Sequence, residues 1–229
     1  MAHVTNLDRA TRALDAGIDG LVHMFIDRLP DPRTLTRMAE RDVFLVATLC
    51  TMGPLAGDRT AEWLTRDERS APLLSEEWRD NLCACWSPNP HGHLDVARDG
   101  VRMLSEAGAR VLVGTDAASV QARGTAHGAS VHDELRLLIE SGMTPLDALR
   151  AATSLAADTY GLGDRGRIAA GKQADLVLVD GDPTADIDDT LSIDEVWRRG
   201  EALDRSARAV DQATHSRPAA HEKLERTRR

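Results

Sequence analysis

The sequence predicts an α/β fold, with a parallel sheet and helical crossovers over residues 1–162 and a small β segment after it. Two observations predict this fold. Short apolar runs alternate with stretches in which apolar residues recur at helical spacing, which is typical of a parallel sheet covered by helices. After residue 161 the strand-like runs are separated by turn-rich segments instead of helices.

The first part of the chain contains four strand-like runs. We expect the first strand to end at His3 and the other three to lie over residues 18–22, 43–49 and 110–114. Capping residues and glycines mark the helices between them, and Asn6 and Asp31 are the clearest caps. The predicted helices are the stretch from Asn6 to Gly17, the stretch after Asp31, and residues 75–86, 94–107, 130–140 and 144–159.

The second part of the chain predicts a small β appendage over residues 163–203. Its expected strands are 167–168, 174–179 and 193–198. From residue 204 to 229 apolar residues are sparse. From Arg205 on, seven Lys and Arg stand against three Asp and Glu, so we expect a disordered basic tail. The predicted domains are therefore 1–162, 163–203 and 204–229.

Charge and composition exclude several classes of function. The net charge of −9 argues against nucleic acid or an anionic membrane as a partner. No apolar run approaches the roughly 18 residues of a membrane span. Three cysteines are too few for a disulfide framework, which favours a reducing compartment, so a cytoplasmic protein is expected. No signal peptide is recognisable at the amino terminus.

Three polar residues at strand ends suggest a metal site. Asp116 follows the apolar run 111–113 within the tetrad Gly-Thr-Asp-Ala, and His3 and His23 close two earlier strands. The carboxyl ends of parallel strands meet at one edge of a sheet, where active sites of such folds lie. Imidazole and carboxylate together are typical zinc ligands, so these three residues are candidates for a divalent metal site, with zinc the expected ion, if the fold brings them together.

Four stretches of the chain resemble the metal-dependent amidohydrolase superfamily, near its imidazolonepropionase-like and prolidase-like members. They are His3 with Ala-Gly-Ile-Asp-Gly-Leu-Val-His at 16–23; Gly-Thr-Asp-Ala at 114–117; His-Asp-Glu-Leu at 132–135 with Gly-Met-Thr-Pro-Leu at 142–146; and Gly-Arg-Ile at 166–168 with Gly-Lys-Gln-Ala-Asp-Leu-Val at 171–177. The resemblance covers about residues 1–203. It implies a partial TIM-type (β/α) barrel, with the equivalents of strands 5–8, followed by part of the family's small β-sandwich.

The resemblance also implies roles for individual residues. His3, His23 and Asp116 would be metal ligands, and Asp116 would also be the catalytic acid and base. His127 and His132, which follow Asp116 in the chain, would bind substrate. The implied reaction is hydrolysis of a non-peptide, cyclic amide-like C–N bond in a small-molecule substrate by a metal-activated water.

The chain departs from the family pattern in two respects. Family members carry a His-x-His pair on the first strand, and binuclear members add a carbamylated lysine. The strands assigned here include no such pair, and the only lysines are Lys172 and Lys223. A complete barrel takes roughly 250 residues. We therefore expect a carboxyl-terminal half that shows little turnover alone and that pairs with a separate amino-terminal half or forms a homo-oligomer, with Met1 as an internal start the other possibility.

Two alternatives remain open. The chain could be a non-catalytic remnant or interaction domain of amidohydrolase ancestry. It could instead hold zinc in a small module formed by Cys83, Cys85, His91 and His93, although the Cys-x-Cys spacing is tighter than is usual for zinc.

Overall fold

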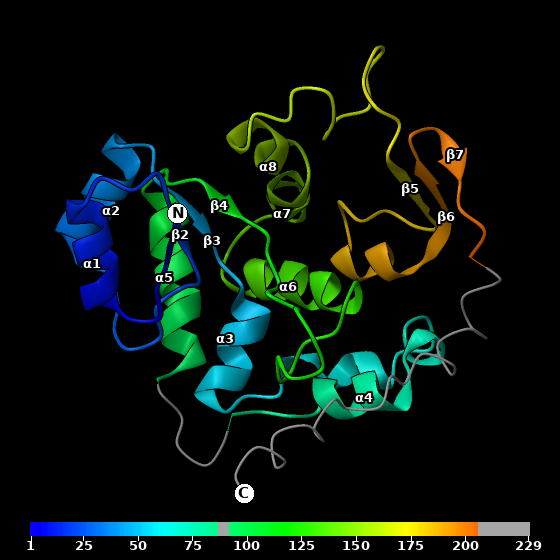
Figure 1. Cartoon of the computed structure of the whole chain (residues 1–229), viewed down its shortest axis with the longest axis horizontal. Helices are drawn as coiled ribbons and strands as arrows, with labels where there is room; N and C mark the ends of the chain where they lie inside the picture. Colours follow the sequence, from blue (N-terminus) through cyan, green and yellow to red (C-terminus); the bar gives the residue numbers. More distant parts are fainter. Residues whose placement is uncertain (87–91, 206–229) are drawn as a thin grey trace, which may run out of the picture.

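The computed structural model describes residues 1–86 and 92–205, and it confirms an α/β fold with a parallel sheet (Figure 1). The sheet has four strands in the order β1-β2-β3-β4, all parallel. These strands are β1 (Ala2–His3), β2 (Gly20–Val22), β3 (Phe44–Val46) and β4 (Val111–Leu112). Spatial order follows chain order, so the four carboxyl ends lie side by side at one edge.

Helices make every connection within this sheet. They are α1 (Leu7–Asp15), α2 (Pro32–Glu40), α3 (Leu49–Ala56), α4 (Glu76–Leu82) and α5 (Leu94–Glu106), with short 3-10 turns η1 (Thr60–Thr65) and η2 (Ala71–Leu73) between α3 and α4. The predicted caps are present: Asn6 accepts a hydrogen bond from the Arg9 amide, and Asp31 accepts one from the Thr34 amide. Each cap satisfies a backbone donor that the first helical turn leaves free.

The core lies between the sheet and the crossover helices. Leu21 and Leu45 of neighbouring strands are fully buried, and Leu14 of α1 and Val101 of α5 belong to the same cluster. Three further helices follow β4: α6 (Ala129–Glu140), α7 (Pro145–Ala152) and α8 (Ser154–Thr159). The sheet is tied to α7 by the Val113 amide, which donates to the Ala151 carbonyl.

The chain then enters a separate antiparallel sheet, ordered β5-β6-β7. Its strands are β5 (Leu176–Val179), β6 (Ile193–Arg198) and β7 (Glu201–Ala202), with the 3-10 turn η3 (Ile187–Leu191) between β5 and β6. Figure 1 shows this sheet apart from the parallel strands, with α6 between the two sheets. The change of architecture after residue 161 is thus present in the structure.

Several predicted boundaries were wrong. The strand expected over 43–49 ends at Val46, because Thr48 adopts a left-handed conformation and α3 starts at Leu49. The expected strand 167–168 does not form; Ile168 is 91% exposed. The helix expected over 144–159 is divided at Thr153, whose φ and ψ of −130° and −92° are not helical.

The helix expected over 75–86 stops at Leu82, and α3 and η1 were not foreseen. The predicted tail 204–229 falls outside the described residues beyond Arg205. None of the helices in the described ranges is long and apolar enough to cross a membrane.

Candidate functional site

The parallel sheet places four polar residues at its carboxyl edge. His3 ends β1, His23 follows β2, Thr48 lies two residues after β3, and Asp116 lies four residues after β4. Because the strands are adjacent and parallel, residues far apart in the sequence meet here. His3, His23 and Asp116, which the sequence predicted to converge, do lie together.

The backbone is strained at this edge. His23, Thr48 and Asp116 have φ values of 72°, 52° and 49°, in the left-handed region that residues other than glycine rarely adopt. For Thr48 the cost is highest, because its side chain branches at Cβ. Strain of this kind persists only where the surroundings enforce it, and it clusters at functional sites.

His23 is the centre of the side-chain contacts. Its Nε2 lies 2.9 Å from Nδ1 of His3 and 3.7 Å from Oδ2 of Asp116. The two imidazole rings meet edge to face, with their centroids 4.3 Å apart. His23 is 2% exposed, whereas the Asp116 side chain is 52% exposed and His3 is also exposed, so both flank the buried His23 on its solvent side.

Thr48 fixes the orientation of His23, and the sequence analysis missed it. The Thr48 Oγ1 and the His23 Nδ1 lie 2.6 Å apart and share a buried hydrogen bond, which leaves Nε2 directed at His3 and Asp116. Bonds of this kind at the second ring nitrogen orient metal-binding histidines. The signal was available, since Thr48 stands at the end of a predicted strand, as His23 and Asp116 do.

The surroundings favour the neutral form of His23. Burial lowers the pKa of His23, the proximity of His3 lowers it further, and Asp116 partly opposes both effects. A neutral imidazole is the form that binds a metal.

A cavity of about 800 Å³ opens over these residues. His3, His23 and Asp116 line it, and both acidic and basic side chains surround them. The remaining lining residues are Thr5, Asn6, Asp8, Arg9, Arg12, Ile26, Asp27, Thr51, Met52, Leu55 and Trp86. The cavity can admit a small polar molecule to the exposed carboxylate of Asp116.

The donor set fits part of a zinc site. Ligands of one tetrahedral zinc ion, each about 2.0–2.1 Å from it, lie roughly 3.3 Å from one another. The distances of 2.9 Å and 3.7 Å around His23 Nε2 fall on either side of that separation. Both contacts are made by one atom, and no group of three or more His, Cys, Asp or Glu side chains in the described ranges is arranged to hold a metal ion. The three residues therefore fit a partial ligand set.

His127 and His132 lie elsewhere. The His127 ring packs edge to face on Trp78, with centroids 5.0 Å apart. His132 shares a 2.8 Å hydrogen bond with Thr190 of η3, and burial lowers its pKa to about 4, assisted by Arg69. Neither residue lines the cavity around Asp116. A role for these two histidines in substrate binding stays a prediction.

The alternative zinc module finds no support among the described residues. Cys83 and Cys85 are free thiols, and with His93 they form no metal-holding group. His91 lies outside the described residues.

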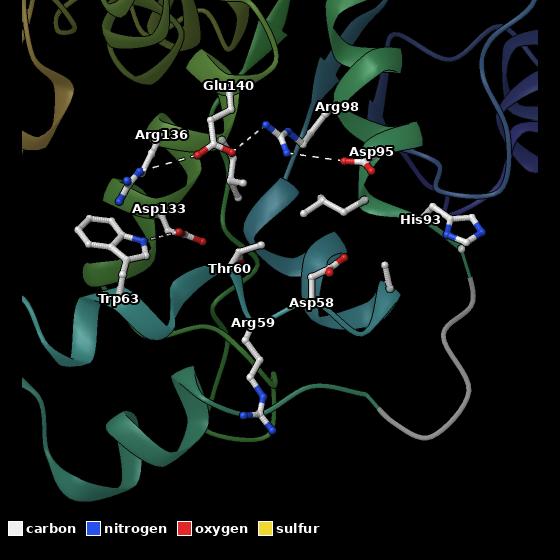
Figure 2. Close-up of a pocket in the computed structure, with 14 residues that line it drawn as sticks. Asp58, Arg59, Thr60, Trp63, His93, Asp95, Arg98, Asp133, Arg136 and Glu140 are labelled. Atoms are coloured by element: carbon white, nitrogen blue, oxygen red, sulfur yellow. Dashed lines mark hydrogen bonds and ion pairs between the residues drawn. The ribbon is translucent and has the colours of Figure 1, made fainter.

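A second cavity, of about 620 Å³, lies between α3, α5, α6 and η1 (Figure 2). Asp133 lines it and accepts a 2.8 Å hydrogen bond from the Trp63 indole. Burial raises the pKa of Asp133 to about 6. None of His3, His23 and Asp116 reaches this cavity.

Comparison with known proteins adds independent findings. The sequence profile described as "Amidohydrolase family" matches residues 1–203. An adenine deaminase from Gluconobacter oxydans is 45% identical over 67 residues, which are 29% of this chain and 12% of the deaminase. An imidazolonepropionase from Deinococcus deserti is 36% identical over 112 residues, 47% of this chain and 27% of that enzyme.

Among solved structures, a putative prolidase from Bifidobacterium longum has a TM-score of 0.66 at 24% identity. The match covers 89% of this chain and 46% of the prolidase, and it bears on the fold alone. The chain thus spans about half the length of this solved relative and a smaller share of the two enzymes above.

Proposed function

Because this chain belongs to the amidohydrolase family, whose profile spans residues 1–203, we propose that it carries part of the active site of a metal-dependent hydrolase. The reaction is the hydrolysis of a non-peptide, cyclic amide-like C–N bond. The observation that carries the proposal is the convergence of His3 Nδ1 and Asp116 Oδ2 on the Nε2 of His23.

The same proposal assigns the architecture. The strands β1–β4 are the equivalents of strands 5–8 of a (β/α) barrel, within a domain over residues 1–162. The antiparallel sheet β5–β7 belongs to an appendage over 163–203. Parallel order, helical crossovers and a site at the carboxyl edge of the strands support this assignment.

His3, His23 and Asp116 are the residues that would hold a divalent metal, for which zinc is the expected ion. When bound, such a metal supplies Lewis-acid chemistry: it acidifies a water molecule and polarises a carbonyl group. His23 contributes a neutral nitrogen whose direction Thr48 fixes.

Asp116 has the position required of the catalytic acid and base. Its carboxylate is half exposed at the cavity while one oxygen faces His23. It can accept a proton from the attacking water and return that proton to the leaving nitrogen. The backbone of Asp116 is in the left-handed region, which is consistent with a position shaped for function.

The substrate class rests on the cavity and on the relatives. The cavity combines arginine and aspartate side chains around Asp116, which suits a small polar molecule. Local similarity to an adenine deaminase and to an imidazolonepropionase supports C–N bond chemistry on a nitrogen-containing ring.

Equilibrium dialysis against zinc tests the proposal. The purified chain should retain zinc after dialysis against buffer at pH 8, and His23→Ala and Asp116→Asn should each weaken zinc binding at least tenfold. His93→Ala, which changes a histidine away from the site, is the matched control and should bind as the wild type does. Zinc binding that is equal in all four proteins would refute the assignment of the ligands.

A second candidate function is a non-catalytic domain of amidohydrolase ancestry. One observation favours it: the described residues contain no complete three-ligand group. A wild-type chain that folds cooperatively and binds no zinc in the dialysis experiment would support this candidate over the hydrolase.

A further inference from the structure

We propose that Glu134 is a positioning residue for the site: from α6 it caps the first turn of α3, and that turn orients His23 and the loop before Asp116. The inference rests on the proposed function, because the residues that Glu134 would position are those of the proposed metal site. The contacts themselves are independent of it.

The helix α3 begins without a cap of its own. Thr48 occupies the N-cap position, but its side chain makes no capping hydrogen bond because it is committed to His23. The first amides of a helix have no partner within the helix, and leaving them unpaired in the interior is costly. The partner comes from α6: the Cys50 amide donates to Oε2 of Glu134 at 2.8 Å.

The capped turn contacts both His23 and the residue before Asp116. Thr48 Oγ1 lies 2.6 Å from His23 Nδ1. Three residues later, Thr51 donates from Oγ1 to the Thr115 carbonyl at 2.7 Å, immediately before Asp116. The Cys50 thiol points at the same carbonyl from 3.6 Å. The turn 48–51 therefore lies between His23 and residues 113–116, which we call the β4 loop, so we expect a shift of the turn to move both.

Burying Glu134 destabilises the fold, so a purely structural cap would not favour this residue. The side chain is fully buried, and its Oε1 has no hydrogen-bond partner. Burial raises the pKa of Glu134 to about 8, although the amides of Cys50 and Leu49 oppose that rise. A half-satisfied carboxyl group in the interior weakens the fold. The favourable contact it makes is the one to α3.

The neighbouring residue provides a matched control. Asp133 is also buried, but it faces the second cavity and accepts its hydrogen bond from Trp63, as Figure 2 shows. Asp133→Asn keeps an oxygen acceptor for the indole and leaves the hydrogen bond between Cys50 and Glu134 in place. It therefore reports the cost of changing a buried carboxyl on α6 without changing the cap.

The test reads the tautomer of His23 in the metal-free chain at pH 8. Long-range ¹⁵N–¹H spectra, with the His23 signals assigned from His23→Ala, should show one fixed tautomer in the wild type, in Asp133→Asn and in Glu134→Gln, whose amide oxygen can still accept from Cys50. Glu134→Leu should give averaged tautomers. Zinc affinity should fall tenfold to a hundredfold in Glu134→Leu, in line with the loss of second-layer support, and stay within threefold in the other two.

A fixed His23 tautomer and unchanged zinc affinity in Glu134→Leu would overturn the proposal, as would Glu134→Gln that behaves like Glu134→Leu. Should Glu134→Leu not fold, Glu134→Asp takes its place, because the shorter side chain withdraws from the Cys50 amide and the same two outcomes apply. If the wild type binds no zinc, the hydrolase function fails, while the tautomer spectra still decide the role of Glu134.

Discussion

At the scale of single residues, the site depends on the two ring nitrogens of His23. His23 Nε2 makes both contacts to the other predicted ligands, and its Nδ1 is fixed by Thr48. A buried, neutral imidazole with one nitrogen already engaged has a single direction in which it can bind. The half-exposed carboxylate of Asp116 and the exposed His3 are the members of the site that a substrate can reach from the cavity.

Asp116→Asn removes the proposed proton acceptor, and kinetics at saturating metal compensate for the weaker metal binding expected of this variant. The amide keeps the shape of the carboxylate but cannot accept a proton from water. In any preparation in which this chain takes part in C–N bond hydrolysis, kcat should fall by about 10²- to 10⁴-fold. Steady-state kinetics at saturating metal measure this, with His93→Ala as the control; a variant that retains more than a tenth of the wild-type kcat would contradict the role given to Asp116.

His132 predicts a pH dependence of stability. Its pKa is about 4 in the folded chain, where burial and Arg69 disfavour the charged form and Asp67 favours it, against 6.5 for the ordinary side chain. Between these values the unfolded chain binds more protons, so the contribution of His132 to stability is lost as the pH falls from about 6.5 towards 4. The raised pKa values of Asp133 and Glu134 act in the opposite direction.

A comparison of wild type with His132→Gln isolates this effect, because both chains share the two carboxyl groups. From pH 7 to pH 4, the wild type should lose about 2 to 3 kcal/mol more of its free energy of unfolding than the variant does. Urea denaturation at several pH values measures the difference. A constant difference between the two proteins across this range would show that His132 is not held neutral.

At the scale of elements, the turns after the strands are shaped by close packing. A Cβ on Gly114 would lie 2.3 Å from Cγ1 of Val46, a stiff, branched side chain on the neighbouring strand. The β4 loop can approach β3 this closely because the glycine has no side chain. The approach brings Thr115 within reach of Thr51 and holds Asp116 near His23.

Gly114→Ala should therefore destabilise the chain by about 1 to 3 kcal/mol, because either Val46 or the loop must shift. Gly163→Ala is the control: a Cβ there meets nothing within 4 Å, and its effect should be within about 0.5 kcal/mol. Urea unfolding of the two variants measures both values. Equal stabilities would show that the loop has room to relax.

The elements also show what the sequence can and cannot predict. Capping chemistry and apolar spacing are local signals, so the helices begun by Asn6 and Asp31 were predicted correctly. The start of α3 depends on a carboxylate 84 positions away, and no local pattern reveals it. Residues 167–168 carry a β-branched residue but find no partner strand, so the local preference did not produce a strand.

At the scale of the whole molecule, the four-stranded sheet has two open sides. In the described part of the chain, β1 pairs only with β2, and β4 only with β3. Apolar residues of β5 are also exposed, with Val177 at 60% and Leu178 at 47%. Unpaired strand edges and exposed apolar side chains favour association with another chain.

We therefore expect the isolated chain to self-associate. Light scattering coupled to size-exclusion chromatography should give a mass at least twice that of one chain, and dilution should shift it downward. A monodisperse monomer that unfolds cooperatively on heating would contradict this expectation.

The sequence predicted the candidate metal-binding residues of the site, but it did not predict the residues that contact and orient them. His3, His23 and Asp116 stand at the ends of apolar runs, and a parallel sheet necessarily brings such ends together. Thr48 and Glu134 act through hydrogen bonds that depend on the packing of α3 against α6 and β3. Thr48 is marked in the sequence by its place at the end of a predicted strand, whereas no local pattern marks Glu134, whose contact with Cys50 depends on how α6 packs against α3.

Anomalous diffraction from crystals grown in zinc tests the central claim most directly. The claim predicts a peak at the zinc edge within about 2.5 Å of the donor atoms of His3, His23 and Asp116, and its loss in Asp116→Asn crystals. A peak instead beside Cys83, Cys85 and His93, or no peak at the strand ends in crystals that hold zinc elsewhere, would contradict it.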